Sequence, residues 1–222
     1  MEEMILIGLD LSMASSDTIE ILISDENVEI ELFREIIDSN KKRPEILLLL
    51  AEGLYVPDDI REEAGRLVNA GLAQRQPEKR DKAYNKESLL QKLQRLTVGE
   101  KILLALRGGR DIRSILLRES NKEVALSVLK NPKITETEVE NIAHSRQVTE
   151  DALRVISKNR EWMKSYTVML ALVSNPKTPP GIGSGLVVNL KKKDLTLLVK
   201  NKNVSEAVRI NAKKLLDIKG QG

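Results

Sequence analysis

The C-terminal third of the chain aligns with itself at an offset of 44 residues. A period of this length, carried by aliphatic side chains and an Asn-Pro-Lys turn, is typical of stacked helical repeats, because each unit buries its apolar face against the next. We therefore predict an all-α fold, an α-solenoid of short helices. The matched positions are Val124, Leu126, Leu129, Asn131, Pro132, Lys133, Leu153, Val155, Lys158 and Asn159, which fall on Val168, Leu170, Val173, Asn175, Pro176, Lys177, Leu197, Val199, Lys202 and Asn203.

Capping patterns predict where the helices begin and end. A polar side chain followed three residues later by Glu satisfies two free backbone N–H groups at a helix start. Together with the prolines and glycines, these patterns predict about a dozen helices, and the segment 4–9 is the one that also fits a strand. The predicted caps are Thr97 with Glu100, Ser120 with Glu123, Thr135 with Glu138, Asn203 with Glu206 and Asp17 with Glu20. The asparagines of the two Asn-Pro-Lys turns are predicted to end helices in the left-handed cap conformation.

Charge is distributed unequally along the chain. Residues 1–71 hold 17 Asp and Glu against 6 Lys and Arg, a net charge of −11, whereas residues 72–222 hold 16 against 30, a net charge of +14. The sign changes within residues 74–86, which contain a proline and show no aliphatic periodicity, so we predict a linker there. The predicted organisation is an acidic helical segment over residues 1–73, this linker, and a basic helical-repeat domain over residues 87–222.

The residue inventory gives little support to enzymatic chemistry. The chain has no cysteine and a single histidine, His144, so thiolate metal sites and catalytic triads lack candidate residues. Gly181, Gly183 and Gly185 match neither nucleotide-binding fingerprint. We therefore expect no catalytic residue, no cofactor and no metal. The acidic start of the chain and the lack of an apolar run of about 18 residues predict a cytoplasmic protein without membrane association.

Three segments carry a resemblance to known helical repeats. They read VALSVLKNPKITETEVENIA, TVMLALVSNPKTPPGIGSGLV and LLVKNKNVSEAVRINAKKLL, starting at Val124, Thr167 and Leu197. The block from Thr97 to Leu216 resembles the HEAT, armadillo and leucine-rich-repeat-variant proteins, and is most similar to an uncharacterised conserved bacterial family of helical-repeat proteins. This resemblance implies a HEAT/armadillo-like superhelix with a long concave surface for a partner, and it implies no catalytic residue.

We expect the partner-binding surface to be basic. Equivalent positions in successive units of an α-solenoid line one edge, so basic clusters there favour a protein partner with an acidic surface. The single tryptophan has two open interpretations, a contact for a partner or a ring packed between repeat units. The candidate residues are Arg107, Arg110, Arg113, Arg118, Trp162, Lys191, Lys192 and Lys193.

The predicted function is a non-enzymatic scaffold or adaptor, and nucleic-acid binding is the alternative to it. A hydrolase or glycosylase ranks third, because one histidine and cap-like carboxylates do not assemble the pocket of titratable residues that it requires. The basic domain also suits nucleic acid, although few aromatics are present for base stacking. Residues 60–72, followed by the basic stretch 74–82, resemble the recognition helix and wing of a winged-helix domain, although the acidic segment before them disfavours DNA. The opposite charges of the two halves also favour attraction within one molecule or self-association between molecules.

Overall fold

The computed structural model of the chain describes residues 10–26, 28–72 and 89–219. Fourteen α-helices and two short 3-10 helices account for all regular secondary structure in these ranges, so the prediction of an all-α fold is confirmed there. No helix in the described ranges is long and apolar enough to cross a bilayer. The segment 4–9, the predicted linker 74–86 and the proposed wing 74–82 lie outside the described residues.

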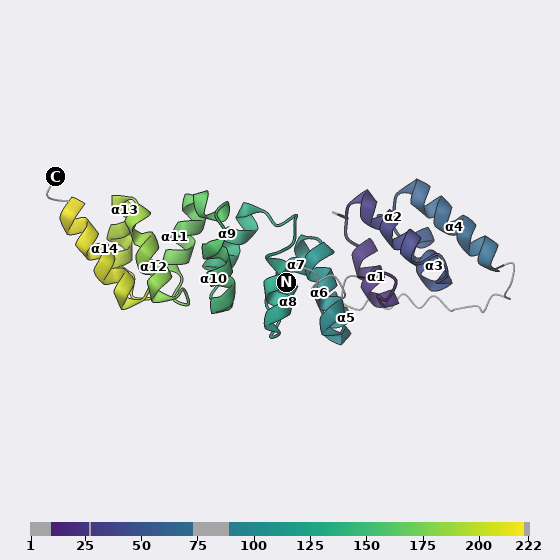
Figure 1. Cartoon of the computed structure of the whole chain (residues 1–222), viewed down its shortest axis with the longest axis horizontal. Coiled ribbons are helices and arrows are strands. Elements are labelled where there is room, and N and C mark those ends of the chain that lie inside the picture. The colour runs from purple at the N-terminus through teal and green to yellow at the C-terminus, as the bar shows by residue number, and fades with distance from the viewer. Residues whose placement is uncertain (1–9, 27, 73–88, 220–222) are drawn as a thin grey trace. The chain divides into compact units, whose positions relative to one another are not determined.

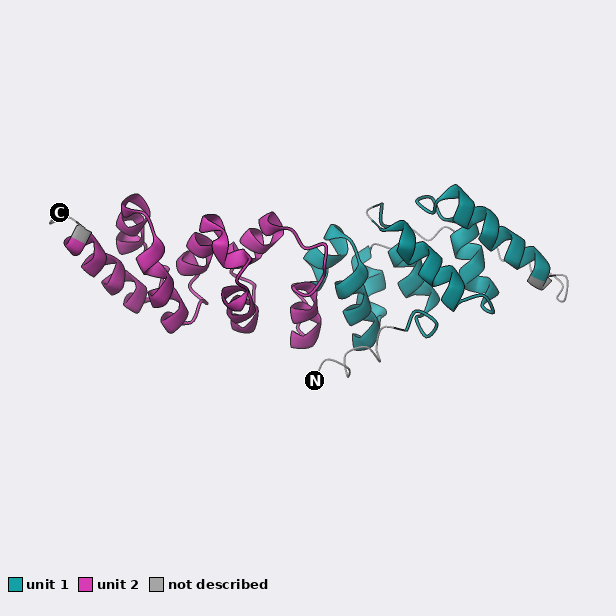
Figure 2. Ribbon diagram, turned by 45° about the horizontal axis from the view of Figure 1, so that its top comes forward, with its two compact units in different colours: residues 1–116 teal, residues 117–222 magenta. Residues whose placement is uncertain are grey.

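The chain divides into two compact units, residues 1–116 (unit 1) and residues 117–222 (unit 2), drawn in different colours in Figure 2. Residues 89–116 therefore share a unit with the acidic helices, and the predicted division into 1–73 and 87–222 stays a prediction. Unit 1 contains α1 (Ser16–Ile23), α2 (Ile30–Ser39), α3 (Pro44–Glu52), α4 (Asp58–Leu72), α5 (Leu89–Arg95), α6 (Val98–Arg107) and α7 (Arg110–Leu116) (Figure 1). Unit 2 contains α8 (Lys122–Val128), α9 (Glu136–His144), α10 (Glu150–Lys158), η2 (Trp162–Lys164), α11 (Tyr166–Ser174), α12 (Pro180–Leu186), η3 (Val187–Asn189), α13 (Lys192–Lys200) and α14 (Glu206–Lys219).

An aliphatic core holds the helices of unit 1 together. α3 packs along α4, and α1 contacts both α3 and α6. Leu22 of α1, Ile36 of α2, Leu50 of α3 and Leu104 of α6 are fully buried in this unit. Burial of one such side chain stabilises a fold by about 1.5–3 kcal/mol relative to exposure. The core therefore stabilises helices that are too short to persist alone.

One carboxylate joins the N-termini of α1 and α6. Glu100 Oε2 accepts hydrogen bonds from the backbone N–H and the hydroxyl of Thr97, at 2.9 and 2.7 Å, which completes the predicted capping box. Glu100 Oε1 accepts from Ser15 N at 3.2 Å and from Thr18 Oγ1 at 3.0 Å. Burial alone would raise the pKa of Glu100, but these hydrogen bonds together lower it to about 2. The Glu100 carboxylate that joins the two helices is therefore ionised at neutral pH.

The helix starts of unit 2 follow the period of the sequence. α8 and α11 begin 44 residues apart, at Lys122 and Tyr166, and α9 and α12 also begin 44 residues apart, at Glu136 and Pro180. α10 and α13 begin 42 residues apart, so the third helix of the period has shifted. The 44-residue period thus corresponds to three short helices rather than two.

The asparagines of the predicted turns act through their side chains. The Oδ1 atoms of Asn131, Asn175 and Asn201 each accept the backbone N–H two residues later, at 2.9 Å in all three cases. Asn175 has a φ of −82°, and no residue in the described ranges has a positive φ. The predicted turns are therefore confirmed, but the predicted left-handed conformation is wrong. A side-chain hydrogen bond that closes the turn removes the need for it.

Two predicted capping boxes are confirmed and three predicted caps are displaced. Thr97 with Glu100 and Thr135 with Glu138 each form both bonds of the box. In the other three cases a neighbouring residue has the side chain that reaches the free N–H groups. Asn121 replaces Ser120, Ser15 replaces Asp17, and Ser205 replaces Asn203, by bonding Val124 N, Thr18 N and Val208 N respectively.

Asn175 provides a test of how α9 and α11 hold together. Its Nδ2 donates to the carbonyls of Ala143 at 2.6 Å and Ser145 at 3.0 Å, at the end of α9. Asn175→Ala should lower the free energy of unfolding by about 1–3 kcal/mol, because both acceptors are left without their donor. Urea denaturation measures this loss. Asn201→Ala is the control, since it removes a turn bond within its own loop, and an equal loss for both variants would contradict the assignment.

Glu100 predicts a loss of stability in acid. Its folded pKa of about 2 lies below the ordinary value of 4.5, so the charged form stabilises the fold. This stability is fully present above about pH 4.5 and is lost as the pH falls through about 2. Denaturation of wild type and Glu100→Gln between about pH 6 and pH 2 should show the wild-type advantage shrinking with acidity. A difference that stays constant over this range would refute the role of the charge.

Candidate functional site

The predicted arginines have different surroundings. Arg107 is exposed but pairs with Glu35 of α2 at 3.3 Å. Arg113 is only 5% exposed, and its Nη1 donates to the carbonyl of Gly108 at 3.0 Å. Arg110 and Arg118 are exposed. Because Arg113 is buried, we leave it out of the proposed binding surface.

The Gly108-Gly109 turn beside these arginines has a structural role. The backbone N–H of Gly109 donates to Asp25 Oδ2 at 2.7 Å. A Cβ atom added to Gly109 would lie 1.9 Å from that oxygen, and one added to Gly108 would lie 2.6 Å from the carbonyl oxygen of Leu104. Only glycine allows the chain to approach Asp25 so closely at this turn. The turn fixes the start of α7 against the acidic helices of unit 1.

Trp162 belongs to the interior side of unit 2. It is partly buried and packs against the hydrophobic cluster that contains Leu153, Val168 and Leu172. Its backbone N–H donates to Asn159 Oδ1 at 3.3 Å, in the turn after α10. The interpretation of a ring packed between helices therefore describes Trp162 better than that of a partner contact.

The three predicted lysines, Lys191 to Lys193, are exposed at the start of α13, and an ordered tyrosine holds this start. The backbone N–H of Lys191 donates to the hydroxyl of Tyr166 at 3.0 Å, and its ammonium lies 4.7 Å from the centre of the Tyr166 ring. That hydroxyl donates in turn to Asp194, which is 6% exposed. Partial burial and then the bond to Asp194 raise the pKa of the Tyr166 phenol, so it stays a neutral donor.

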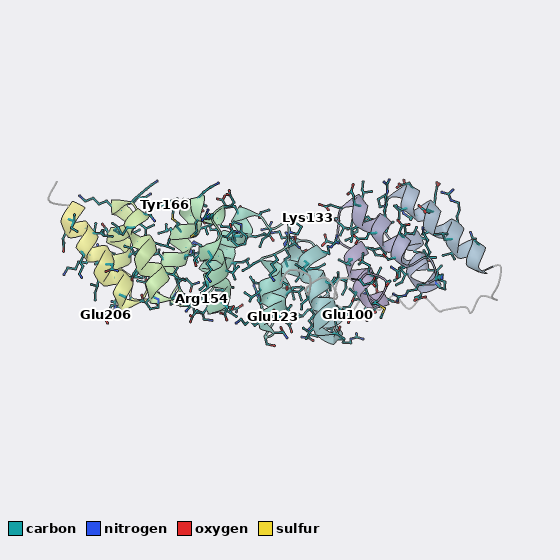
Figure 3. The ribbon with its side chains drawn as sticks, in the orientation of Figure 1. Glu100, Glu123, Lys133, Arg154, Tyr166 and Glu206 are labelled. Carbon is teal, nitrogen blue, oxygen red and sulfur yellow. The ribbon has the colours of Figure 1, made fainter. Side chains whose placement is uncertain are left out.

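The exposed side of α13 combines positive charge with an aliphatic side chain. Lys193, Leu197 and Lys200 follow one another at helical spacing, and Leu197 is 66% exposed. Lys192 and Lys193 form no ion pair with any residue that the structure describes. We call the exposed set Lys191, Lys192, Lys193, Leu197 and Lys200 the lysine face. Figure 3 shows Tyr166, which contacts Lys191, on the edge of unit 2 opposite Arg154 and Glu206.

The lysine face lies in the more basic half of unit 2. Residues 165–222 hold ten Lys and Arg against three Asp and Glu, whereas residues 117–164 hold nine against eight. One of the three acidic residues, Asp194, is buried against Tyr166. The positive charge of unit 2 is therefore concentrated on its C-terminal helices, where it gives a local positive potential.

Sequence reasoning found the lysines but missed the residues that order them. Tyr166 and Asp194 are 28 residues apart in sequence, so no local pattern joins them. Leu197 aligns with Leu153 at the 44-residue offset, yet Leu153 is fully buried and Leu197 is exposed. The two-residue shift between α10 and α13 accounts for this difference, because it turns aligned positions to different faces of their helices.

Comparison with known protein families, curated proteins and solved structures finds no match to this chain. Within the described residues, no group of three or more His, Asp and Glu side chains is arranged to hold a metal ion. The lysine face is therefore the candidate site, on the strength of its exposure, charge and ordered start.

Gly109→Ala tests whether the glycine turn holds α7 in place. The added methyl group collides with the Asp25 carboxylate, so we expect a loss of about 1–3 kcal/mol in the free energy of unfolding. The measurement is urea denaturation followed by circular dichroism. Gly99→Ala in α6 is the matched control, because nothing lies within 4 Å of its added Cβ atom. If the Gly109 variant is as stable as the Gly99 variant, the close contact with Asp25 does not exist.

Proposed function

We propose that the protein is a non-enzymatic scaffold, a HEAT/armadillo-like α-solenoid that binds an acidic protein on its lysine face. The observation that carries the proposal is the lysine face itself. It presents ammonium groups without ion-pair partners beside an exposed leucine, on an edge that Tyr166 orders. Surfaces of this kind steer an oppositely charged partner and then bury an apolar contact against it.

Contacts within unit 2 support the stacked arrangement. α8 packs on α10, α9 on α11, and α12 on α14, so helices contact the next but one along the chain. Asn175, at the end of α11, donates to carbonyls at the end of α9, so these two helices end at the same edge. Contacts that recur in this way are expected when successive repeat units stack side by side.

The lysine face fits an acidic protein better than a nucleic acid. Nucleic-acid surfaces combine positive charge with aromatic rings on which bases stack. Here the Tyr166 ring is covered by Lys191, and Trp162 packs against the core. The exposed apolar side chains near the lysines are aliphatic, with Leu197 66% and Val188 56% exposed. Aliphatic groups between charges are suited to a protein surface with matching leucines and carboxylates.

The proposal is tested by reversing the charge of the face. Lys192→Glu combined with Lys193→Glu should reduce captured protein at least about tenfold, because the face then has no net positive charge to attract an acidic partner. The measurement is quantitative affinity capture from the native organism after nuclease treatment, with the retained protein then rebound in purified form. Lys130→Glu combined with Arg146→Glu is the control, since it changes the net charge equally at exposed positions elsewhere in unit 2.

Two outcomes would count against the proposal. Unchanged capture by the lysine variant would remove the face from partner binding. Binding of a DNA duplex by the wild type, lost steeply with rising salt and abolished in the lysine variant, would assign the face to phosphate groups instead.

A further inference from the structure

Unit 1 carries an exposed surface with the opposite character to the lysine face. The loop between α3 and α4 places Leu54 at 80% exposure and Tyr55 at 45% exposure. The first two turns of α4 follow at once. We call this set the acidic loop surface, and it consists of Leu54, Tyr55, Asp58, Asp59, Glu62 and Glu63, whose four carboxylates are all exposed.

The loop that presents Leu54 is fixed in place. Val56, two residues later, is 1% exposed and anchors the loop in the core of unit 1. Gly53 packs so tightly on it that an added Cβ atom would lie 2.5 Å from Val56 Cγ2. The backbone carbonyl of Val56 accepts two hydrogen bonds from Arg61, both at 3.0 Å. Leu54 therefore points outward from an ordered loop, and a large apolar group held outward in this way marks a contact surface.

Neighbouring cations neutralise only part of this surface. Arg61 pairs with Asp58 at 3.3 Å, and Arg34 pairs with Asp59 at 3.5 Å. Lys41 pairs with Asp38 at 2.7 Å and lies near enough to Glu63 for that charge to help raise the Lys41 pKa. Residues 52–63 nevertheless hold five acidic side chains against one arginine. A negative potential therefore surrounds the exposed leucine and tyrosine.

We propose that the lysine face binds the acidic loop surface of a second copy of this chain. Each surface presents an exposed leucine, Leu197 on one and Leu54 on the other, among charges of one sign. The two signs are opposite, so approach of the second copy is favoured while approach of like surfaces is opposed. This inference rests on the proposed function, because it names the acidic protein that the lysine face receives.

Two charge-reversal variants, tested singly and as a mixture, distinguish a contact between copies from attraction within one molecule. The full-length lysine variant combines Lys192→Glu with Lys193→Glu, and the full-length acidic variant combines Glu62→Lys with Glu63→Lys. Wild type at about 50 mM salt should sediment above the 24.9 kDa of one chain, and at about 500 mM salt it should approach that mass. Each variant alone should sediment as a monomer, because one of its two surfaces then carries no net charge and no longer attracts the other. An equimolar mixture of the two variants should associate again.

The apolar part of the contact has its own variant. Leu54→Ser should raise the dissociation constant of wild-type self-association at least about fivefold, because an aliphatic contact is lost. Met13→Ser is the matched control, because Met13 is 82% exposed in unit 1 and lies outside the acidic loop surface.

Two results would overturn the inference. One is wild type that stays at 24.9 kDa in low salt, and the other is a mixture of the two variants that stays monomeric. If wild type stays monomeric yet still captures a different acidic protein through the lysine face, the second copy is the wrong partner and the proposed function stands. If the lysine variant captures that protein as well as wild type does, the proposed function fails by itself.

Discussion

The structure depends on how its short helices satisfy their own ends. An α-helix leaves four N–H groups and four carbonyls without partners inside it, so a helix of nine residues leaves nearly half of its backbone polar groups unpaired. Nine-residue helices recur along this chain, α3, α9, α10, α11 and α13 among them. Thr97, Thr135 and Thr149 bond the free N–H groups at three helix starts. Without such side chains, burial of the aliphatic core would also bury unpaired backbone groups, at a cost comparable to what the core contributes.

Several of these end-capping groups also join different helices. Glu100 caps its own helix and accepts from Ser15 at the start of α1, Asn175 bonds the end of α9, and Asp25 bonds Gly109 before α7. A single side chain thus satisfies a helix end and fixes the position of a neighbour. Ion pairs also join helices of unit 1, where acidic residues of α1 and α2 pair with basic residues of α5 and α6. Exposed charges of one sign remain on the acidic loop surface and, in unit 2, on the lysine face.

The sequence predicted what is local and missed what is distant. The helical class, the Asn-Pro-Lys turns and the capping boxes at Thr97 and Thr135 depend on residues within four positions of one another, and each was found. The left-handed asparagines were predicted wrongly because a side-chain bond serves the same purpose. The burial of Arg113 and the pairing of Tyr166 with Asp194 depend on tertiary packing, which no local spacing reveals. For the candidate site, the lysines were therefore predictable from the sequence. The residues that order them, Tyr166 and Asp194, and the exposure of Leu197 beside them were not.

Both exposed surfaces lie on backbone that is already ordered before a partner binds. Val56 and Gly53 fix the loop that carries Leu54. The start of the lysine face is fixed by Tyr166, whose hydroxyl accepts from Lys191 N–H and donates to Asp194. Binding therefore does not have to immobilise a backbone segment, which would otherwise cost about 1–2 kcal/mol for each residue that becomes ordered. The lysine side chains still lose rotamer freedom, so the net gain from each charge pair at an exposed site is small. Specificity then comes from the sign of the charge, and strength comes from the few aliphatic groups that the charges bring together.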